Sequence, residues 1–316
     1  MRKLVSLMVM FAVMPCFADA RLDAAIENVR TACSGISDEL SDMKTMAGIN
    51  TAVTGVGTVA GGVALGTGLA KASVDKKVEA IEAEIIEMDG YRLKKISVPE
   101  FYLQFGDLLK QVEGAEAAAS AIDMRREELK RLVQKSKNLG NWRTGTVAAA
   151  AAANIAGAVI AGTNKVKGDL KSRINQCIEM TRALADARMQ AHISKTATEQ
   201  ELNRAERIVA ACREWETVAD IDSINTKAQG AMISSGVGAG LGIAGTVTSA
   251  MANSDSVRED NSESGKKKEK NLNTASNILA GGTTVASGVA TVFNATQIKA
   301  IKRAASVADE CEGALR

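Results

Sequence analysis

The stretch Thr45–Ala70, TMAGINTAVTGVGTVAGGVALGTGLA, decides what kind of fold this chain can form. It contains no charged residue and is long enough to cross a lipid bilayer as a helix. Gly, Ala and Thr dominate it, so the helix would carry little side-chain bulk. Three further charge-free stretches of similar composition follow, at 144–164, 228–254 and 271–297. Four such segments predict four long helices that pack closely.

Small residues recur at every fourth position in three of these stretches. The rows are Thr58, Gly62, Gly66 and Ala70; Gly238, Gly242, Thr246 and Ala250; and Ala280, Thr284 and Gly288. Rows of this kind let two helix backbones approach closely. Each glycine costs about 1 kcal/mol relative to Ala inside a helix, so the rows need a packing partner. The predicted helix-packing zipper residues are therefore Gly62, Gly66, Gly238, Gly242 and Gly288. At the level of the motif, these rows resemble the glycine zippers of membrane-associated bacterial envelope proteins.

The charged segments between these stretches are also helical in character. Aromatic residues make up only 3% of the chain, and Pro99 is the one proline after residue 20. Residues 74–88 place Val74, Val78, Ile81, Ile85 and Met88 at the spacing of a coiled-coil seam. A matching face follows at 107–135, formed by Leu108, Val112, Ala115, Ala119, Ile122, Leu129 and Val133, although Arg126 interrupts it. Ser97–Glu100 resembles a capping box at the start of the second helix, so a coiled-coil hairpin is predicted over 73–137.

The two halves of the chain repeat a common order of features. VRTAC precedes an Ile-Asn-Thr and a glycine-rich stretch in the first half, and IVAAC does so in the second. Each half then closes with a Gly/Ala stretch, a basic helix and a cysteine. The repeat predicts two related hairpins. Their bounds are 21–72 with 138–195, and 196–316 with a flexible loop at 253–272. Both hairpins and the insertion are expected to form a single helical domain over 21–316.

Four cysteines remain after residue 20, and an even number in an exported chain favours disulfides. Cys212 and Cys311 lie equally far from the predicted turn near residue 262, so antiparallel helices would bring them together. By analogy Cys33 would pair with Cys177. Cys177 and Cys212 are also level about a turn near residue 194, so all three connectivities stay open.

Residues 1–20 have the three parts of a secretory signal. MRK is followed by the apolar run LVSLMVMFAV and by Ala18-Asp19-Ala20, which suits a signal peptidase. Cys16 suggests a lipoprotein, but Pro15 directly before it fits poorly, so cleavage after Ala20 is expected. The protein is therefore expected to be exported to a bacterial periplasm, to the outer envelope or to the medium.

The sequence contains no residue pattern that indicates catalysis. His192 is the single histidine, no CxxC pair suggests zinc, and no catalytic triad can be drawn. Gly240–Gly245 matches GxGxxG but lacks the preceding strand that gives the motif meaning. Lys and Arg number 39 against 37 Asp and Glu, which excludes the basic excess of a nucleic-acid binder. We expect no enzyme, no cofactor, no metal and no small-molecule substrate.

Taken together, the sequence predicts an all-α protein, an elongated antiparallel bundle of two duplicated glycine-zipper hairpins with a coiled-coil insertion. Two functional interpretations follow. In the favoured one, the chain is a soluble structural or interaction protein that binds a protein partner or itself through helices 74–135. In the alternative, the stretches insert into a membrane as in pore-forming or envelope-associated proteins. Their low content of Leu, Ile, Val and Phe weighs against insertion.

Overall fold

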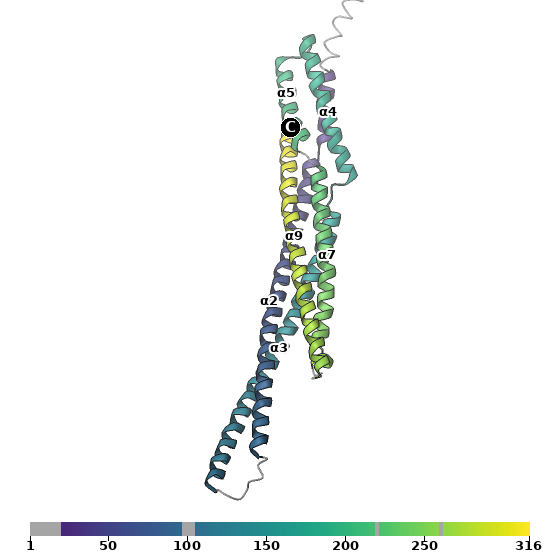
Figure 1. Cartoon of the computed structure of the whole chain (residues 1–316). Helices are drawn as coiled ribbons and strands as arrows, with labels where there is room; N and C mark the ends of the chain where they lie inside the picture. The colour runs from purple at the N-terminus through teal and green to yellow at the C-terminus, as the bar shows by residue number, and fades with distance from the viewer. Residues whose placement is uncertain (1–19, 97–104, 219–220, 259–261) are drawn as a thin grey trace, which may run out of the picture. The chain divides into compact units, whose positions relative to one another are not determined.

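The computed structural model describes residues 20–96, 105–218, 221–258 and 262–316. Within these ranges the protein is all-α and has no strand, as the sequence predicts (Figure 1). A helix over 20–33 is followed by α2 (Ile36–Ile96), α3 (Phe105–Thr163), α4 (Gly168–Ser194), α5 (Glu199–Arg213), α6 (Trp215–Val218), α7 (Ile221–Asn253), α8 (Asp255–Arg258) and α9 (Glu263–Leu315). Residues 1–19 of the predicted signal at 1–20, and the capping box at Ser97–Glu100, lie outside the described residues.

The chain forms two compact units. The first, here called the disulfide unit, comprises the chain up to Gly55, Ile155–Gly236 and Gly288–Arg316. The second, the coiled-coil unit, comprises Val56–Asn154 and Val237–Ser287. Both units draw on α2, α3, α7 and α9, because each of these helices is long enough to contribute to both.

Local sequence sets the ends of the helices in the disulfide unit. Gly35 has a φ of 69°, which glycine adopts without strain, and it separates the helix over 20–33 from α2. Lys195 ends α4 in the left-handed conformation. Thr198 then caps α5 in a capping box, in which its hydroxyl accepts from the Glu201 amide and the Glu201 carboxylate accepts from the Thr198 amide. The turn between α4 and α5 lets these two helices pack side by side (Figure 1).

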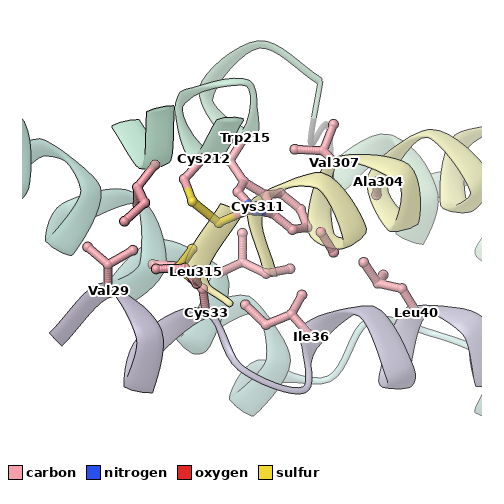
Figure 2. Packing of buried hydrophobic residues seen from close by; sticks show 14 of the residues in the cluster. Val29, Cys33, Ile36, Leu40, Cys212, Trp215, Ala304, Val307, Cys311 and Leu315 are labelled. Carbon is pink, nitrogen blue, oxygen red and sulfur yellow. A yellow bond between two sulfur atoms is a disulfide. The ribbon is translucent and has the colours of Figure 1, made fainter. Parts of the chain in front are cut away.

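The disulfide unit has an ordinary hydrophobic core of large side chains. Figure 2 shows Val29, Ile36, Leu40 and Trp215 gathered around the cysteines. Bonds join Cys33 to Cys177 and Cys212 to Cys311, with Cα–Cα distances of 4.9 and 4.5 Å. This is the pairing that the hairpin symmetry favoured among the three connectivities. Each bond ties together helices that are far apart in sequence.

The coiled-coil unit buries part of the predicted seam between α2 and α3. Val74, Ile81, Ile85 and Ile122 are buried, at most 8% exposed. On α3, however, Val133 is 42% exposed, and its neighbour Leu132 is the half-buried residue in that turn. Arg126 is exposed, so it does not interrupt the packed face. The side chains of Leu108, Val112 and Ala115 lie outside the described residues.

The segment 253–272, expected to be a flexible loop, is largely helical. Asp255–Arg258 forms α8, and α9 begins at Glu263. The Lys and Glu residues that suggested a loop are also strong helix formers. They continue a packed face, because Gly265 is buried and Glu269 is half-buried. A loop over 263–272 is therefore corrected to the first turns of α9.

Candidate functional site: four helix segments with a polar interior

Each of the four charge-free stretches has one buried face, on which buried residues recur at alternating steps of three and four positions. On α2 the buried positions are Ala47, Asn50, Thr54, Gly57, Gly61, Ala64, Gly68 and Lys71. The same steps continue on α3 over 136–161, on α7 over 221–252 and on α9 over 276–315. An average spacing of 3.5 residues is that of a left-handed coiled coil. We call the buried positions within the charge-free stretches the polar seam.

The composition of the polar seam is unusual for a protein interior. Within the described residues of the four stretches, every buried hydrophobic residue is an alanine except Val147. The other buried side chains are the amides and hydroxyls of Asn50, Thr54, Asn154, Asn164, Ser235, Ser249, Ser276, Thr283, Ser287, Asn294 and Gln297. Little apolar area is therefore removed from water along these segments, so the hydrophobic effect contributes little to holding them together.

In the disulfide unit the seam amides connect helices through hydrogen bonds. Asn50 donates through Nδ2 to Asn294 Oδ1 at 2.9 Å, and Asn294 donates to Thr54 Oγ1 at 3.3 Å. Gln297 donates through Nε2 to the Asn164 carbonyl at 2.9 Å. These bonds link α2 and α9 to each other and α9 to the end of α3. Interhelical bonds between buried amides fix the register of the helices, because a shifted helix would leave them unpaired.

In the coiled-coil unit one amide–hydroxyl pair lies in the polar seam, and one buried arginine borders it. Asn154 and Ser287 exchange hydrogen bonds of 2.7 and 3.0 Å. Arg143 is fully buried, and its guanidinium donates to Ser249 Oγ at 3.0 Å and to the side-chain oxygens of Asn273 and Asn277 at 2.8 and 3.3 Å. All three acceptors are neutral, and an Arg guanidinium stays protonated in proteins. The space between the packed helices thus contains a cation at the border of the charge-free stretch of α3.

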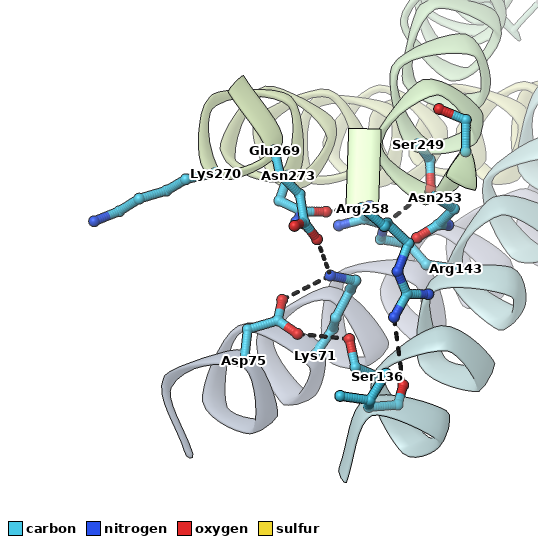
Figure 3. Close-up of polar contacts among 12 residues, drawn as sticks. Lys71, Asp75, Ser136, Arg143, Ser249, Asn253, Arg258, Glu269, Lys270 and Asn273 are labelled. Atoms are coloured by element: carbon cyan, nitrogen blue, oxygen red, sulfur yellow. Dashed lines mark hydrogen bonds and ion pairs between the residues drawn. The ribbon is translucent and has the colours of Figure 1, made fainter. Parts of the chain in front are cut away.

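A second buried cation lies nearby, as Figure 3 shows. The Lys71 side chain is 1% exposed, and its Nζ contacts Asp75 Oδ2 at 2.6 Å and Glu269 Oε1 at 3.2 Å. Ser136 donates to the other oxygen of Asp75 at 2.6 Å. A cavity of about 500 Å³ opens beside this cluster and is lined by charges of both signs, Arg258 among them. Lys71 is the first charged residue after the charge-free stretch of α2, so the cluster marks where that stretch ends.

Glycines of the polar seam make room for the polar groups that face them. A Cβ added at Gly61 would lie 2.6 Å from Thr284 Oγ1, and one at Gly238 would lie 2.9 Å from the Asn154 amide. At Gly242 it would lie 2.8 Å from Ala151 Cβ and 3.0 Å from Ala151 Cα. Real side chains do not approach so closely. At Gly61 and Gly242 the close neighbours include backbone atoms of the facing helix, so the helix backbones lie within a distance that only glycine permits, whereas at Gly238 they belong to the Asn154 side chain.

The predicted zipper glycines divide into two groups. Gly238 and Gly242 lie on the buried face of α7, whereas a Cβ at Gly62, Gly66 or Gly288 would meet no atom within 4 Å. The contacts on α2 fall instead at Gly57, Gly61 and Gly68. The buried face follows the 3.5-residue repeat, and a row taken at every fourth residue leaves that face after one or two turns.

The outer face of the same segments is apolar. Among the described residues, 23 large hydrophobic side chains are exposed, and 17 of them lie in the four charge-free stretches. Val59 and Val285, each 68% exposed, are among the most exposed of them. The helices that carry the stretches are, by length and composition, long and apolar enough to cross a membrane. Branched apolar side chains outside and small polar ones inside reverse the usual arrangement of a water-soluble helix bundle.

Other residues that the sequence singled out have ordinary surroundings. His192 is exposed near the end of α4, and Gly240–Gly245 lies inside α7 without a strand before it. Of the two tryptophans in the chain, Trp142 is 67% exposed and Trp215 is buried beside the cysteines. Arg143 and Lys71 were not singled out in advance, although each is the charged residue bordering a charge-free stretch.

No protein-family model matches this chain, and the comparisons with curated proteins and with solved structures gave no significant match.

Proposed function

We propose that this protein is exported and that its four charge-free helix segments insert into a lipid bilayer, with a structural and non-enzymatic role. The disulfide-linked core of large side chains would remain outside the hydrocarbon. This was the less favoured of the two interpretations from sequence. The distribution of side chains between the inside and the outside of the helices now makes it the better supported one.

The single observation that carries the proposal is the concentration of exposed Val, Ile, Leu and Met side chains on the charge-free stretches. In water, this face would hold apolar area that folding fails to bury, which soluble monomers avoid over large patches. In lipid, each Val, Ile or Leu near the middle of a helix contributes roughly −0.3 to −0.6 kcal/mol to insertion. The outer face therefore supplies a favourable free energy of insertion, because the large apolar side chains of these stretches face outward, where lipid would contact them.

The polar seam supports the same proposal. Helices in a bilayer gain nothing from hydrophobic association, so they associate through small residues and interhelical hydrogen bonds. The contacts at Gly61, Gly238 and Gly242 and the bonds among Asn50, Asn294 and Thr54 are of these two kinds.

Carbonate extraction of liposomes tests the proposal directly. The mature chain, residues 21–316, is mixed with liposomes, washed with alkaline carbonate and separated by centrifugation. We expect the chain in the lipid pellet. Recovery in the supernatant, from a chain that circular dichroism shows to be helical, would refute insertion.

A pair of substitutions separates insertion from adsorption. Val59→Lys with Val285→Lys places a charge near the middle of two stretches, on side chains that are already exposed. In a bilayer each charge costs roughly 2.5–3.5 kcal/mol, so the pellet fraction should fall sharply. Ile86→Lys is the matched control, because Ile86 is 72% exposed but lies outside the stretches. Equal extraction of the double variant and the control would contradict insertion.

A second candidate function rests on a different observation. On the predicted coiled-coil hairpin, Ile86 and Met124 are 72% and 66% exposed, beyond the charge-free stretches. An apolar surface there suits a protein partner or a second copy of the chain, as the sequence predicted for helices 74–135. If carbonate releases the chain, sedimentation of the wild type and of Ile86→Lys would test this candidate, because only the wild type should then self-associate or retain a partner.

A further inference from the structure

The two disulfides of the disulfide unit lie next to each other in its core. The Sγ atoms of Cys33, Cys177 and Cys311 all lie within 4.8 Å of one another. Cys212 is bonded to Cys311, and none of the four residues is more than 1% exposed. The four cysteines come from four helices: the helix over 20–33, α4, α5 and α9. Figure 2 shows Cys33 close to the bond between Cys212 and Cys311.

This convergence matches the donor set of a structural zinc site. Zn²⁺ binds four thiolates tetrahedrally at about 2.3 Å, which places the sulfur atoms roughly 3.8 Å apart. The sulfurs of Cys33 and Cys177 each lie within 4.8 Å of the Cys311 sulfur, about 1 Å more than that spacing. The Cys212 sulfur is bonded to Cys311 and would have to move to complete the tetrahedron. Breaking both S–S bonds would let the side chains rotate apart around a common centre. No sequence pattern predicts this site, because the four cysteines are far apart along the chain and form no CxxC pair.

We propose that the chain, when both disulfides are reduced, binds one Zn²⁺ through Cys33, Cys177, Cys212 and Cys311. The same four helices would then be held together at the same place in both states. Two disulfide bonds would join them in the oxidised chain, and one metal ion would join them in the reduced chain. The inference does not depend on membrane insertion, because all four ligands lie outside the charge-free stretches.

Two neighbouring groups suit a site with four thiolates. The indole Nε1–H of Trp215 is buried and has no hydrogen-bond partner among the described residues. The Trp215 ring lies beside Cys311 in Figure 2, so this donor is available to a thiolate sulfur. The Arg30 guanidinium donates to the Leu315 carbonyl at 2.9 Å, within about one helical turn of Cys33 and of Cys311 along the chain. The same guanidinium also pairs with Glu27, so only part of its positive charge would offset the net charge of −2 on a zinc tetrathiolate. Loss of a hydrogen bond to a metal ligand, such as one from the Trp215 indole, typically costs 10- to 100-fold in metal affinity.

Exchange between the two states needs an external reductant or oxidant. A dithiol or phosphine reductant supplies two electrons and two protons are taken up for each disulfide, giving four thiols. Binding of Zn²⁺ then releases the four thiol protons. A disulfide oxidant that removes four electrons from the four thiolates re-forms both S–S bonds and expels Zn²⁺.

Cobalt binding to the reduced mature chain tests the proposal. The chain is reduced with a phosphine without oxygen, and Co²⁺ is titrated as a spectroscopic substitute for Zn²⁺. We expect one Co²⁺ per chain with the absorption of a tetrahedral tetrathiolate, displacement by Zn²⁺, and no binding to the oxidised chain. Cys212→Ser should weaken binding at least 10-fold and change the spectrum. Trp215→Phe keeps the aromatic ring but removes the N–H, and should weaken binding without altering the ligand set.

Two results would overturn the zinc site. One is a reduced chain that stays helical and shows no thiolate–cobalt absorption. The other is a reduced chain that loses its helicity and does not regain it when Zn²⁺ is added. A Cys212→Ser variant that binds Co²⁺ as tightly as the wild type would equally exclude the four-thiolate site.

Discussion

Replacing single glycines with alanine tests whether α7 approaches α3 as closely as the structure shows. In any helix interior, Gly→Ala stabilises by about 1 kcal/mol through backbone entropy. At Gly62 nothing lies within 4 Å of the added Cβ, so Gly62→Ala should gain that amount. At Gly242 the added Cβ would lie 3.0 Å from the Cα of Ala151, and a backbone atom cannot move aside as a side chain can. Overpacking of this kind typically costs 1–3 kcal/mol.

The expected difference between the two variants is therefore roughly 1–3 kcal/mol in the free energy of unfolding, since both receive the same entropic gain. Thermal unfolding followed by far-ultraviolet circular dichroism should place the midpoint of Gly62→Ala above the wild type and that of Gly242→Ala below or near it. Gly238→Ala should fall between them, because the Asn154 side chain that faces Gly238 can rotate. A Gly242→Ala protein as stable as Gly62→Ala would show that the close approach at Ala151 is absent.

Three further perturbations follow from the contacts described. In Arg143→Lys, the lysine ammonium cannot reach all three acceptors of the guanidinium. The free energy of unfolding should therefore fall by about 1–3 kcal/mol in denaturant titrations. Hydrogen bonds from the backbone N–H and the hydroxyl of Thr198 lower the pKa of Glu201. The stability that this carboxylate adds is thus complete above its ordinary pKa and is lost as the pH falls through the lowered value. Thr198→Ala should return the pKa of Glu201, followed by NMR, towards its ordinary value. Finally, a non-reduced tryptic digest should contain the Cys212 and Cys311 peptides joined, and replacing both with Ser should lower stability by about 2–5 kcal/mol because the bond closes a long loop.

Much of the architecture could be inferred from residue order. Helix-forming composition and the scarcity of proline predicted an all-α chain, and the equal distances of Cys212 and Cys311 from a central turn favoured the pairing that the structure holds. The spacing of Val74, Ile81 and Ile85 predicted a buried face because their positions along a helix fix their angular positions around it. The duplication of the two halves and the signal peptide stay predictions.

The inner and outer faces of the charge-free stretches could not be assigned in the same way. Along Thr45–Ala70 small residues occur on every side of the helix, so hydrophobic periodicity gives no direction. The choice between Gly61 and Gly62 as the contacting residue depends on which neighbour helix is present and at what register. For the same reason, Arg143 and Lys71 look from sequence like ordinary charges at the ends of apolar runs, and they are buried only because two other helices cover them.

The sequence by itself therefore determined the helices and their charge-free segments, because these depend on composition and on distances along one chain. It favoured one cysteine pairing without deciding between the three connectivities. The tertiary structure alone decided that amides and alanines face inward while valines and isoleucines face outward, and that all four cysteines meet in one core. Those features depend on the packing of four helices at a fixed register. That register is set by glycine contacts between neighbouring helices and by interhelical hydrogen bonds whose partners lie more than a hundred positions apart.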